Sequence, residues 1–201
     1  MKQRNKKIVI ANFYPVWPVI GGGQRRIFFL AKELSKAFSV ELITLERSGI
    51  SSTLNFSGSL KEIKVAVDPQ FRALERDINQ KVKMAADLAY TLYWDRCKLY
   101  QSILAECVKS ASAVVTAHPY STYALISAMK NNQRPLVFDS QNVEQLQKEP
   151  ILRAYPQYLE EIKKIEKASI DNAAVTIACS PSDAQGFARL YKAREDKIAI
   201  V

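Results

Sequence analysis

The stretch KIVIANFYPVWPVIGGGQRRIFFLAKELSKAF, Lys7 to Phe38, decides the fold. A short apolar run is followed by two prolines and three glycines, Gly21 to Gly23, and then by apolar residues that recur every three or four positions. This order predicts a strand, a glycine-rich loop and a helix. The loop leaves backbone N–H groups unshielded and the helix adds the positive end of its dipole, so the junction suits a phosphate or a carboxylate. The simpler interpretation is a turn that binds no ligand.

The rest of the chain alternates between predicted strands and helices. Residues 48–59 are rich in Ser and Gly and predict a loop, and the helical pattern from Pro69 to Ser110 is expected to break near Trp94 and Asp95. Ser180 and Pro181 predict the start of the last helix, with Asp183 answering the cap. Further strands are predicted at 40–45, 61–67 (an edge strand), 113–117, 135–138, 174–179 and 197–201, and further helices at about 121–131 and 157–172.

This alternation predicts an α/β fold, a doubly wound, mostly parallel sheet of about seven strands with helices on both faces, in the manner of a Rossmann fold. Ligands bind such sheets outside the carboxyl ends of the strands. The residues at those positions are therefore the candidates for a site. They are the loop from Gly21 to Arg26, His118, the segment from Asp139 to Glu144, and Ser180.

The chain is strongly basic, with 29 Lys and Arg against 20 Asp and Glu and a formal charge of +9 over 201 residues. Lys2, Arg4, Lys6 and Lys7 crowd the first seven positions with no acid among them. An excess of this sign fits nucleic acid, a phosphorylated substrate or an acidic membrane surface, and a solvated basic tail is the simplest interpretation. Charge alone does not choose among these partners.

The sequence lacks the patterns that mark several classes of protein. Roughly 18 consecutive apolar residues, the minimum for a membrane span, occur nowhere, and no small-residue cleavage pattern follows the basic start. Cys97, Cys107 and Cys179 are widely spaced and form no CxxC, which argues against a disulfide framework or a zinc site and favours a reducing cytosol.

Two phosphate-binding motifs can be compared with the glycine-rich loop. A Walker loop is excluded because no Gly-Lys-Ser/Thr follows the glycines. A dinucleotide fingerprint needs its first glycine directly after the strand and a small residue where Arg26 stands, although Glu46 resembles the ribose-binding acid. A nucleotide-dependent oxidoreductase therefore ranks third among the possible functions, behind the two described below.

The order of these motifs resembles the N-terminal domain of family 4 (group 1) glycosyltransferases, which have the GT-B fold. The likeness covers essentially the whole chain. It rests on Gly21-Gly22-Gly23, Leu30-Ala31-Lys32-Glu33-Leu34, Val40-Glu41-Leu42-Ile43-Thr44, His118, Phe138-Asp139-Ser140-Gln141-Asn142-Val143-Glu144, Ile165-Glu166-Lys167 to Asn172-Ala173-Ala174, and Cys179-Ser180-Pro181-Ser182-Asp183-Ala184.

The resemblance implies that residues 1–201 form the N-terminal, acceptor-side domain of a retaining glycosyltransferase. It would face a C-terminal domain that binds the nucleotide sugar and is absent from this chain, and alone it would be inactive. The family works without a metal or other cofactor, and the nucleotide sugar is its donor substrate. The acceptor would be a glycan, a lipid-linked sugar or a small molecule, as in polysaccharide biosynthesis. The enzyme would be located in the cytoplasm, with peripheral contact at the inner face of the membrane.

The resemblance also assigns roles to residues. Gly22 and Gly23 would lie against the donor diphosphate, and His118, the candidate catalytic residue, would contact the donor sugar. Gln24, Arg25, Asn142 and Glu144 would line the acceptor side of the cleft. The simpler interpretation of His118 is a loop residue that caps the next helix. Gln141 stands where many relatives have a histidine, which leaves open the role of the segment that follows the strand predicted at 135–138.

The runner-up hypothesis is a non-catalytic module that binds an acidic membrane surface or nucleic acid through the basic N-terminus. Binding of that kind would fall steeply with ionic strength, whereas recognition of a sugar acceptor would not. For a glycosyltransferase, nucleic acid is not an expected partner.

Overall fold

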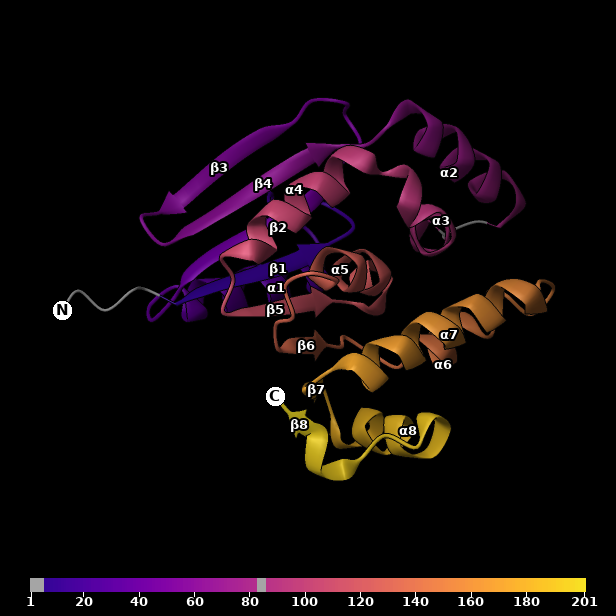
Figure 1. Ribbon diagram of the computed structural model, residues 1–201. Helices are drawn as coiled ribbons and strands as arrows, with labels where there is room; N and C mark the ends of the chain where they lie inside the picture. The colour runs from indigo at the N-terminus through magenta and orange to yellow at the C-terminus, as the bar shows by residue number, and fades with distance from the viewer. Residues whose placement is uncertain (1–5, 83–85) are drawn as a thin grey trace.

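The structure, a computed structural model, describes residues 6–82 and 86–201. The described part of the chain forms one eight-stranded sheet in the order β3-β4-β2-β1-β5-β6-β7-β8, covered by helices (Figure 1). Only the outer pair, β3 and β4, is antiparallel, so the predicted doubly wound, mostly parallel sheet is confirmed. The strands are β1 (Lys7–Asn12), β2 (Ser39–Glu46), β3 (Ser52–Ser57), β4 (Leu60–Ala66), β5 (Ala113–Ala117), β6 (Leu136–Asp139), β7 (Val175–Ala178) and β8 (Ile198–Ile200).

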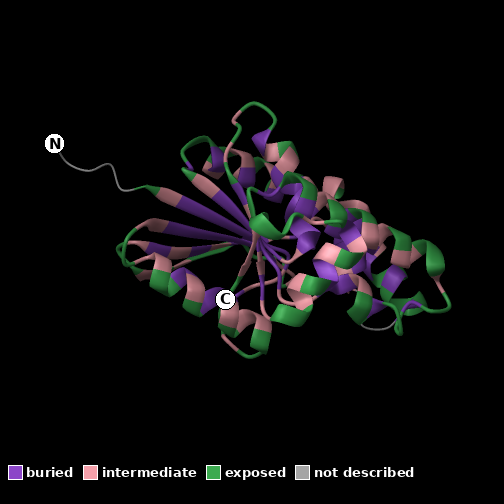
Figure 2. Ribbon diagram, turned by 90° about the horizontal axis from the view of Figure 1, so that it is seen from below, coloured by how far each residue is buried: buried purple, intermediate pink, exposed green. Residues whose placement is uncertain are grey.

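Both faces of the central strand β1 are buried, which explains its unbroken apolar run. Ile8 and Ile10 pack with Ile27 of the first helix on one face, and Val9 and Ala11 pack with the other helices on the opposite face. Buried residues accordingly gather along the strands (Figure 2). The helices are α1 (Gly22–Leu34), α2 (Pro69–Lys81), α3 (Ala86–Tyr93), α4 (Lys98–Lys109), α5 (Thr122–Met129), α6 (Glu144–Lys148), α7 (Pro156–Asn172) and α8 (Pro181–Tyr191), with 3₁₀ turns at Trp94–Arg96, Pro119–Ser121 and Glu195–Lys197.

Two sequence predictions at the edge of the sheet were wrong. Residues 48–59 are not all loop, because β3 pairs with β4 through the turn after Ser57. Its alternation is weak: only Leu54 and Phe56 are half-buried, between exposed polar residues. The strand predicted at 61–67 is β4, which pairs with β2 as well as β3 and is therefore not an edge strand. Because β3 was not predicted, the sheet has eight strands rather than about seven.

The long helical pattern from Pro69 to Ser110 is also divided more than predicted. The break near Trp94 is confirmed, but α2 already ends at Lys81, where Val82 has the extended dihedrals φ −131° and ψ 111°. Ala85, which the pattern placed in this helix, lies outside the described residues, as do Lys2 and Arg4. The short helix α6 was not predicted, because five residues carry too little periodicity.

The last helix begins as predicted. The Ser180 hydroxyl accepts a hydrogen bond from the Asp183 N–H at 3.1 Å, and Pro181 occupies the first helical position. Ser180 and Asp183 are thus explained by capping. Within residues 6–82 and 86–201, every helix is too short or too polar to cross a membrane.

The strand order reverses at β1. From β1 the chain crosses to β2 on one side of the sheet, and later strands from β5 onward add on the other side. The loops that follow β1, β5 and β6 therefore meet the start of α1 at the carboxyl edge of the sheet. This is the position at which doubly wound sheets bind ligands.

Candidate functional site

His118 is the first residue after β5 and has an unusual backbone. Its φ of 76° lies in the region that residues with a side chain rarely adopt. The conformation is held on both sides, since the His118 N–H donates to the Asp139 carbonyl at 3.3 Å and the Thr116 hydroxyl donates to the His118 carbonyl at 2.6 Å. Strained residues that the surrounding structure holds in this way cluster at functional sites.

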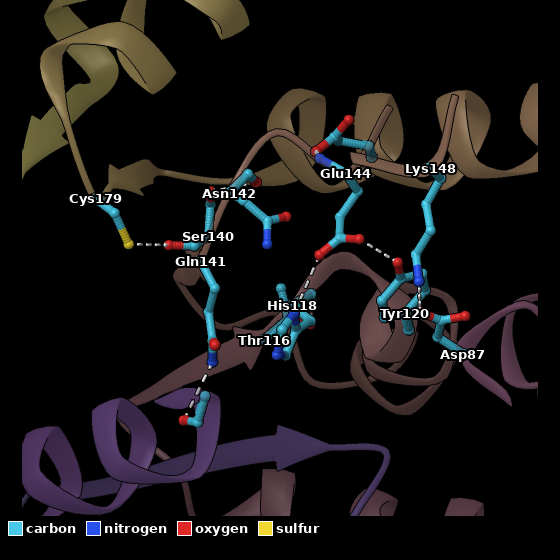
Figure 3. Close-up of polar contacts among 12 residues, drawn as sticks. Asp87, Thr116, His118, Tyr120, Ser140, Gln141, Asn142, Glu144, Lys148 and Cys179 are labelled. Atoms are coloured by element: carbon cyan, nitrogen blue, oxygen red, sulfur yellow. Dashed lines mark hydrogen bonds and ion pairs between the residues drawn. The ribbon is translucent and has the colours of Figure 1, made fainter. Parts of the chain in front are cut away.

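The imidazole of His118 is held at both nitrogens. Nε2 lies 2.9 Å from the Tyr14 hydroxyl. Nδ1 lies 3.3 Å from Oε1 of Glu144, a contact that Figure 3 shows. One tautomer of the imidazole satisfies both contacts: Nδ1–H donates to the Glu144 carboxylate, and Nε2 accepts from the Tyr14 hydroxyl. Burial raises the pKa of Tyr14 to about 12, which keeps the hydroxyl protonated at neutral pH.

Aromatic rings fix the same imidazole. Phe13 meets it edge-on with ring centroids 5.7 Å apart, and Tyr120 stacks on it at 6.0 Å. Tyr120 also donates its hydroxyl to Oε2, the second carboxylate oxygen of Glu144. The Glu144 side chain is 3% exposed and the His118 side chain 12%. Glu144 is therefore fully engaged by His118 and Tyr120.

The glycine-rich loop brings a helix N-terminus to this histidine. The first intrahelical bond of α1 runs from Arg25 N–H to the Gly21 carbonyl at 3.0 Å, so the N–H groups of Gly22 and Gly23 have no partner within the helix. A Cβ on Gly22 would meet nothing within 4 Å, but one on Gly23 would lie 2.7 Å from the Tyr14 hydroxyl. It would also lie 2.6 Å from Oε1 of Gln141. Gly23 thus allows α1 to approach the Tyr14–His118 pair.

The next residues of α1 differ in their surroundings. Gln24 accepts from the Ile20 and Gly21 N–H groups at 3.1 and 2.9 Å and donates to the Pro15 carbonyl at 2.8 Å, so its side chain closes the loop. Arg25 is exposed beside it.

Arg26 binds Asp139 at the end of β6, with 2.8 Å between Nη2 and Oδ1. Asp139 is buried, and burial raises the pKa of its carboxyl although the Arg26 guanidinium opposes that rise. This ion pair ties the first turn of α1 to the strand that leads into Glu144.

The predicted site residues therefore fall into two groups. His118, Glu144 and Gly23 are brought together, the last through Tyr14, and Gly22 precedes Gly23 as the first residue of α1. Gln24, Arg25 and Asn142 lie on the same edge of the sheet, and Asn142 has a buried side-chain oxygen with no hydrogen-bond partner among the described residues. Their assignment to the acceptor stays a prediction.

Sequence reasoning missed Tyr14 and Tyr120, and it did not foresee the contact of Gln141 with Gly23. Tyr14 comes two residues after β1 and Tyr120 two residues after His118, so both follow carboxyl ends of strands. That position was a usable signal. Gln141 was noticed only as a departure from a family pattern, yet its amide donates to the Gly23 carbonyl at 3.4 Å.

Three further features bear on the earlier hypotheses. In the described ranges, no three His, Cys, Asp or Glu side chains are grouped so as to hold a metal ion. Cys97, Cys107 and Cys179 are free thiols. At the opposite, amino edge of the sheet, a shallow open depression is lined by residues that we call the basic patch. It consists of Lys6, Lys7 and Lys109 with Ser39, Gly58, Ser59, Ser110 and Ser112.

Comparison with known proteins identifies the fold. Neither a protein-family model nor a curated protein matches this sequence. Among solved structures, sucrose-phosphate synthase of Thermosynechococcus elongatus matches with a TM-score of 0.69 and 14% identity, over 98% of this chain and 47% of that chain. HepE of Anabaena in complex with UDP and glucose matches with a TM-score of 0.60 and 12% identity, over 98% of this chain and 44% of that one. HepE in complex with UDP-glucose gives 0.58 and 11%, over 97% and 43%.

The chain thus spans about half the length of these proteins and has the fold of one half of them. The predicted Rossmann-like half of a GT-B fold is confirmed as a fold.

Proposed function

We propose that this chain is the acceptor-side, N-terminal domain of a retaining, metal-independent glycosyltransferase that takes its sugar from a nucleotide sugar. The fold supports this proposal, because HepE, which shares it, was solved with UDP and with UDP-glucose. A second domain would complete the donor site and close the cleft over it. A uridine diphosphate sugar is the first donor to test.

One observation carries the proposal. The Tyr14 hydroxyl lies between Nε2 of His118 and the Gly23 backbone, so the imidazole and the N-terminus of α1 lie on either side of one hydroxyl at the carboxyl edge of the sheet. A nucleotide sugar presents two groups that complement these, side by side. Its hydroxyl-rich ring suits the imidazole, and its anionic diphosphate suits the helix N-terminus.

The roles follow from this geometry. The N–H groups of Gly22 and Gly23, at the positive end of the α1 dipole, stabilise the charge that grows on the leaving phosphate. His118 contacts the donor sugar through Nε2, which accepts from a sugar hydroxyl in place of Tyr14. In this proposal Glu144, predicted as an acceptor contact, orients His118. Arg25 and Asn142 keep their predicted acceptor roles, and Gln24 shapes the acceptor side by closing the loop.

The test uses the chain expressed with whatever coding sequence follows Val201. Release of nucleoside diphosphate is measured from a panel of uridine, guanosine and adenosine diphosphate sugars, for the wild type, His118→Ala and the basic-patch control Lys109→Ala. We expect turnover of one donor class, and a loss of at least about tenfold in His118→Ala, which corresponds to one contact of about 1.4 kcal/mol. Turnover of no donor, or equal rates in the two variants, would overturn the proposal.

The basic patch favours a second candidate, a module that binds anionic surfaces. Part of its charge is already neutralised, because Lys7 pairs with Glu41 and Lys109 pairs with Glu106, both at 2.5 Å. Binding of this kind would weaken steeply as salt rises and would be lost in Lys109→Ala rather than in His118→Ala.

A further inference from the structure

The helix that carries Glu144 cannot fix its own position. α6 has five residues, Glu144–Lys148, and isolated helices of that length are not stable in water. Glu144 is its first residue, so the direction of its carboxylate depends on what holds the first turn of α6. At the other end, Lys148 forms an ion pair with Asp87 of α3 (Figure 3).

The first turn of α6 is held by a buried carboxylate from another helix. Glu166 of α7 accepts from the Glu144 N–H at 2.6 Å with Oε1 and from the Gln145 N–H at 3.0 Å with Oε2. Its residue exposure is 0%, and Oε2 also accepts from the Tyr191 hydroxyl of α8 at 2.5 Å. Glu166 therefore uses both oxygens on three donors from two elements.

Such a residue is costly to bury. Burial raises the pKa of Glu166 to about 7, although its three donors favour the ionised form. An apolar side chain would fill the same volume without that cost. A carboxylate at this position is explained by the two N–H groups that it holds in place.

The contacts continue from Glu166 to the histidine. Glu166 holds the backbone of Glu144, and the side chain of Glu144 holds Nδ1 of His118. We propose that Glu166 is a positioning residue for His118: by fixing the first turn of α6 it fixes the Glu144 carboxylate, and so keeps the imidazole proton on Nδ1. Nε2 then remains an acceptor toward Tyr14 and, if the proposed function holds, toward the donor sugar.

His118 is the only histidine of the chain, so its ring can be observed without ambiguity. Residues 1–201 are labelled with ¹⁵N, purified without a histidine tag, and studied by long-range ¹H–¹⁵N NMR at about pH 8.5, above the ordinary histidine range. These spectra report which ring nitrogen carries the proton. We expect the Nδ1–H form in the wild type and a loss of that form, with Nε2–H appearing, in Glu166→Gln.

The matched control is Glu41→Gln, which also removes a buried carboxylate but lies at the amino end of β2, far along the strands from His118. It should leave the ring spectrum unchanged. Tyr191→Phe removes one donor to Glu166 and keeps the ring that packs against Phe187, so a smaller change in the same direction is expected if Glu166→Gln does not fold.

A double-variant cycle tests the route of the effect. In Glu144→Ala the histidine has already lost its partner, so adding Glu166→Gln should change the ring spectrum no further. The proposal is overturned if folded Glu166→Gln shows the wild-type tautomer, or if the two substitutions act additively. Both results are independent of donor turnover, so failure here is distinct from failure of the proposed function.

Discussion

Adding one methyl group at Gly23 should disturb the candidate site, whereas the same change at Gly22 should not. In Gly23→Ala the new Cβ would lie 2.7 Å from the Tyr14 hydroxyl, and ordinary contact begins near 3.4 Å, so Tyr14 must retreat by about 0.7 Å. The hydroxyl lies between Gly23 and Nε2 of His118, which is only 2.9 Å away, so it cannot retreat straight toward the imidazole. It must swing aside instead, which breaks the Tyr14–His118 hydrogen bond. Nothing lies within 4 Å of a Cβ on Gly22.

The expected cost follows from that one lost bond. A broken hydrogen bond that leaves a partly buried acceptor unpaired costs about 1–2 kcal/mol. Both variants gain the same helix propensity, up to about 1 kcal/mol for Gly to Ala, so this gain cancels between them. Gly23→Ala should therefore be about 1–2 kcal/mol less stable than Gly22→Ala.

The assay is urea unfolding of the two variants followed by circular dichroism, with the His118 ring spectrum as a second readout. A lower midpoint and a shifted ring spectrum in Gly23→Ala alone are the predicted results. Equal midpoints with unchanged His118 signals in both variants would refute the contact between α1 and Tyr14.

Three further predictions concern buried charges and thiols. Arg26→Ala should lower the free energy of unfolding by about 1–3 kcal/mol because it leaves the buried Asp139 carboxylate unpaired, whereas Arg25→Ala should have little effect; urea unfolding compares them, and equal losses would contradict the ion pair. The free energy of unfolding should fall by about 2–3 kcal/mol as pH rises from about 4.5 to 7, because the folded protein, with the Glu166 pKa at about 7, holds the proton of the Glu166 carboxyl more tightly than the unfolded chain. Glu166→Gln should lack this share of the decline. Cys97, whose pKa burial raises to about 12, should react with Ellman's reagent at about pH 8 only after unfolding, and rapid reaction of the native thiol would show that its surroundings are open.

Much of the fold was predictable because its strands are buried on both faces. Runs such as Val114 to Ala117 have no charge, and the helices between them have a clear three-to-four periodicity. The antiparallel strand β3 was not predicted because four of its six residues are exposed and its flanks resemble a loop. Val82 ended a helix that the apolar pattern continued, since periodicity does not reveal where tertiary packing turns the chain.

The site was predictable in position but not in detail. The topological rule placed His118, Gly23 and Glu144 at one edge of the sheet, and the structure brings them together. Their connection depends on contacts over long sequence separations, such as Tyr14 with His118 and Glu144 with Glu166, which no local pattern encodes. Glu166 is one of several charged residues in the helix predicted at 157–172, and no local pattern distinguishes it, yet it is fully buried.

The most direct test of the account is to map where a nucleoside diphosphate contacts this chain. UDP is titrated into the ¹⁵N-labelled chain expressed with whatever coding sequence follows Val201, because the second domain completes the donor site. The backbone amide shifts of Gly22 and Gly23 are compared with those of Lys109 and Ser110 in the basic patch, with uridine as the control without phosphate. We predict that UDP, and not uridine, shifts Gly22, Gly23 and the His118 ring, and that this response survives moderate salt. Shifts confined to the basic patch and abolished by salt, or no shift at any site, would contradict the assignment of the α1 N-terminus and His118 to a nucleotide-sugar site.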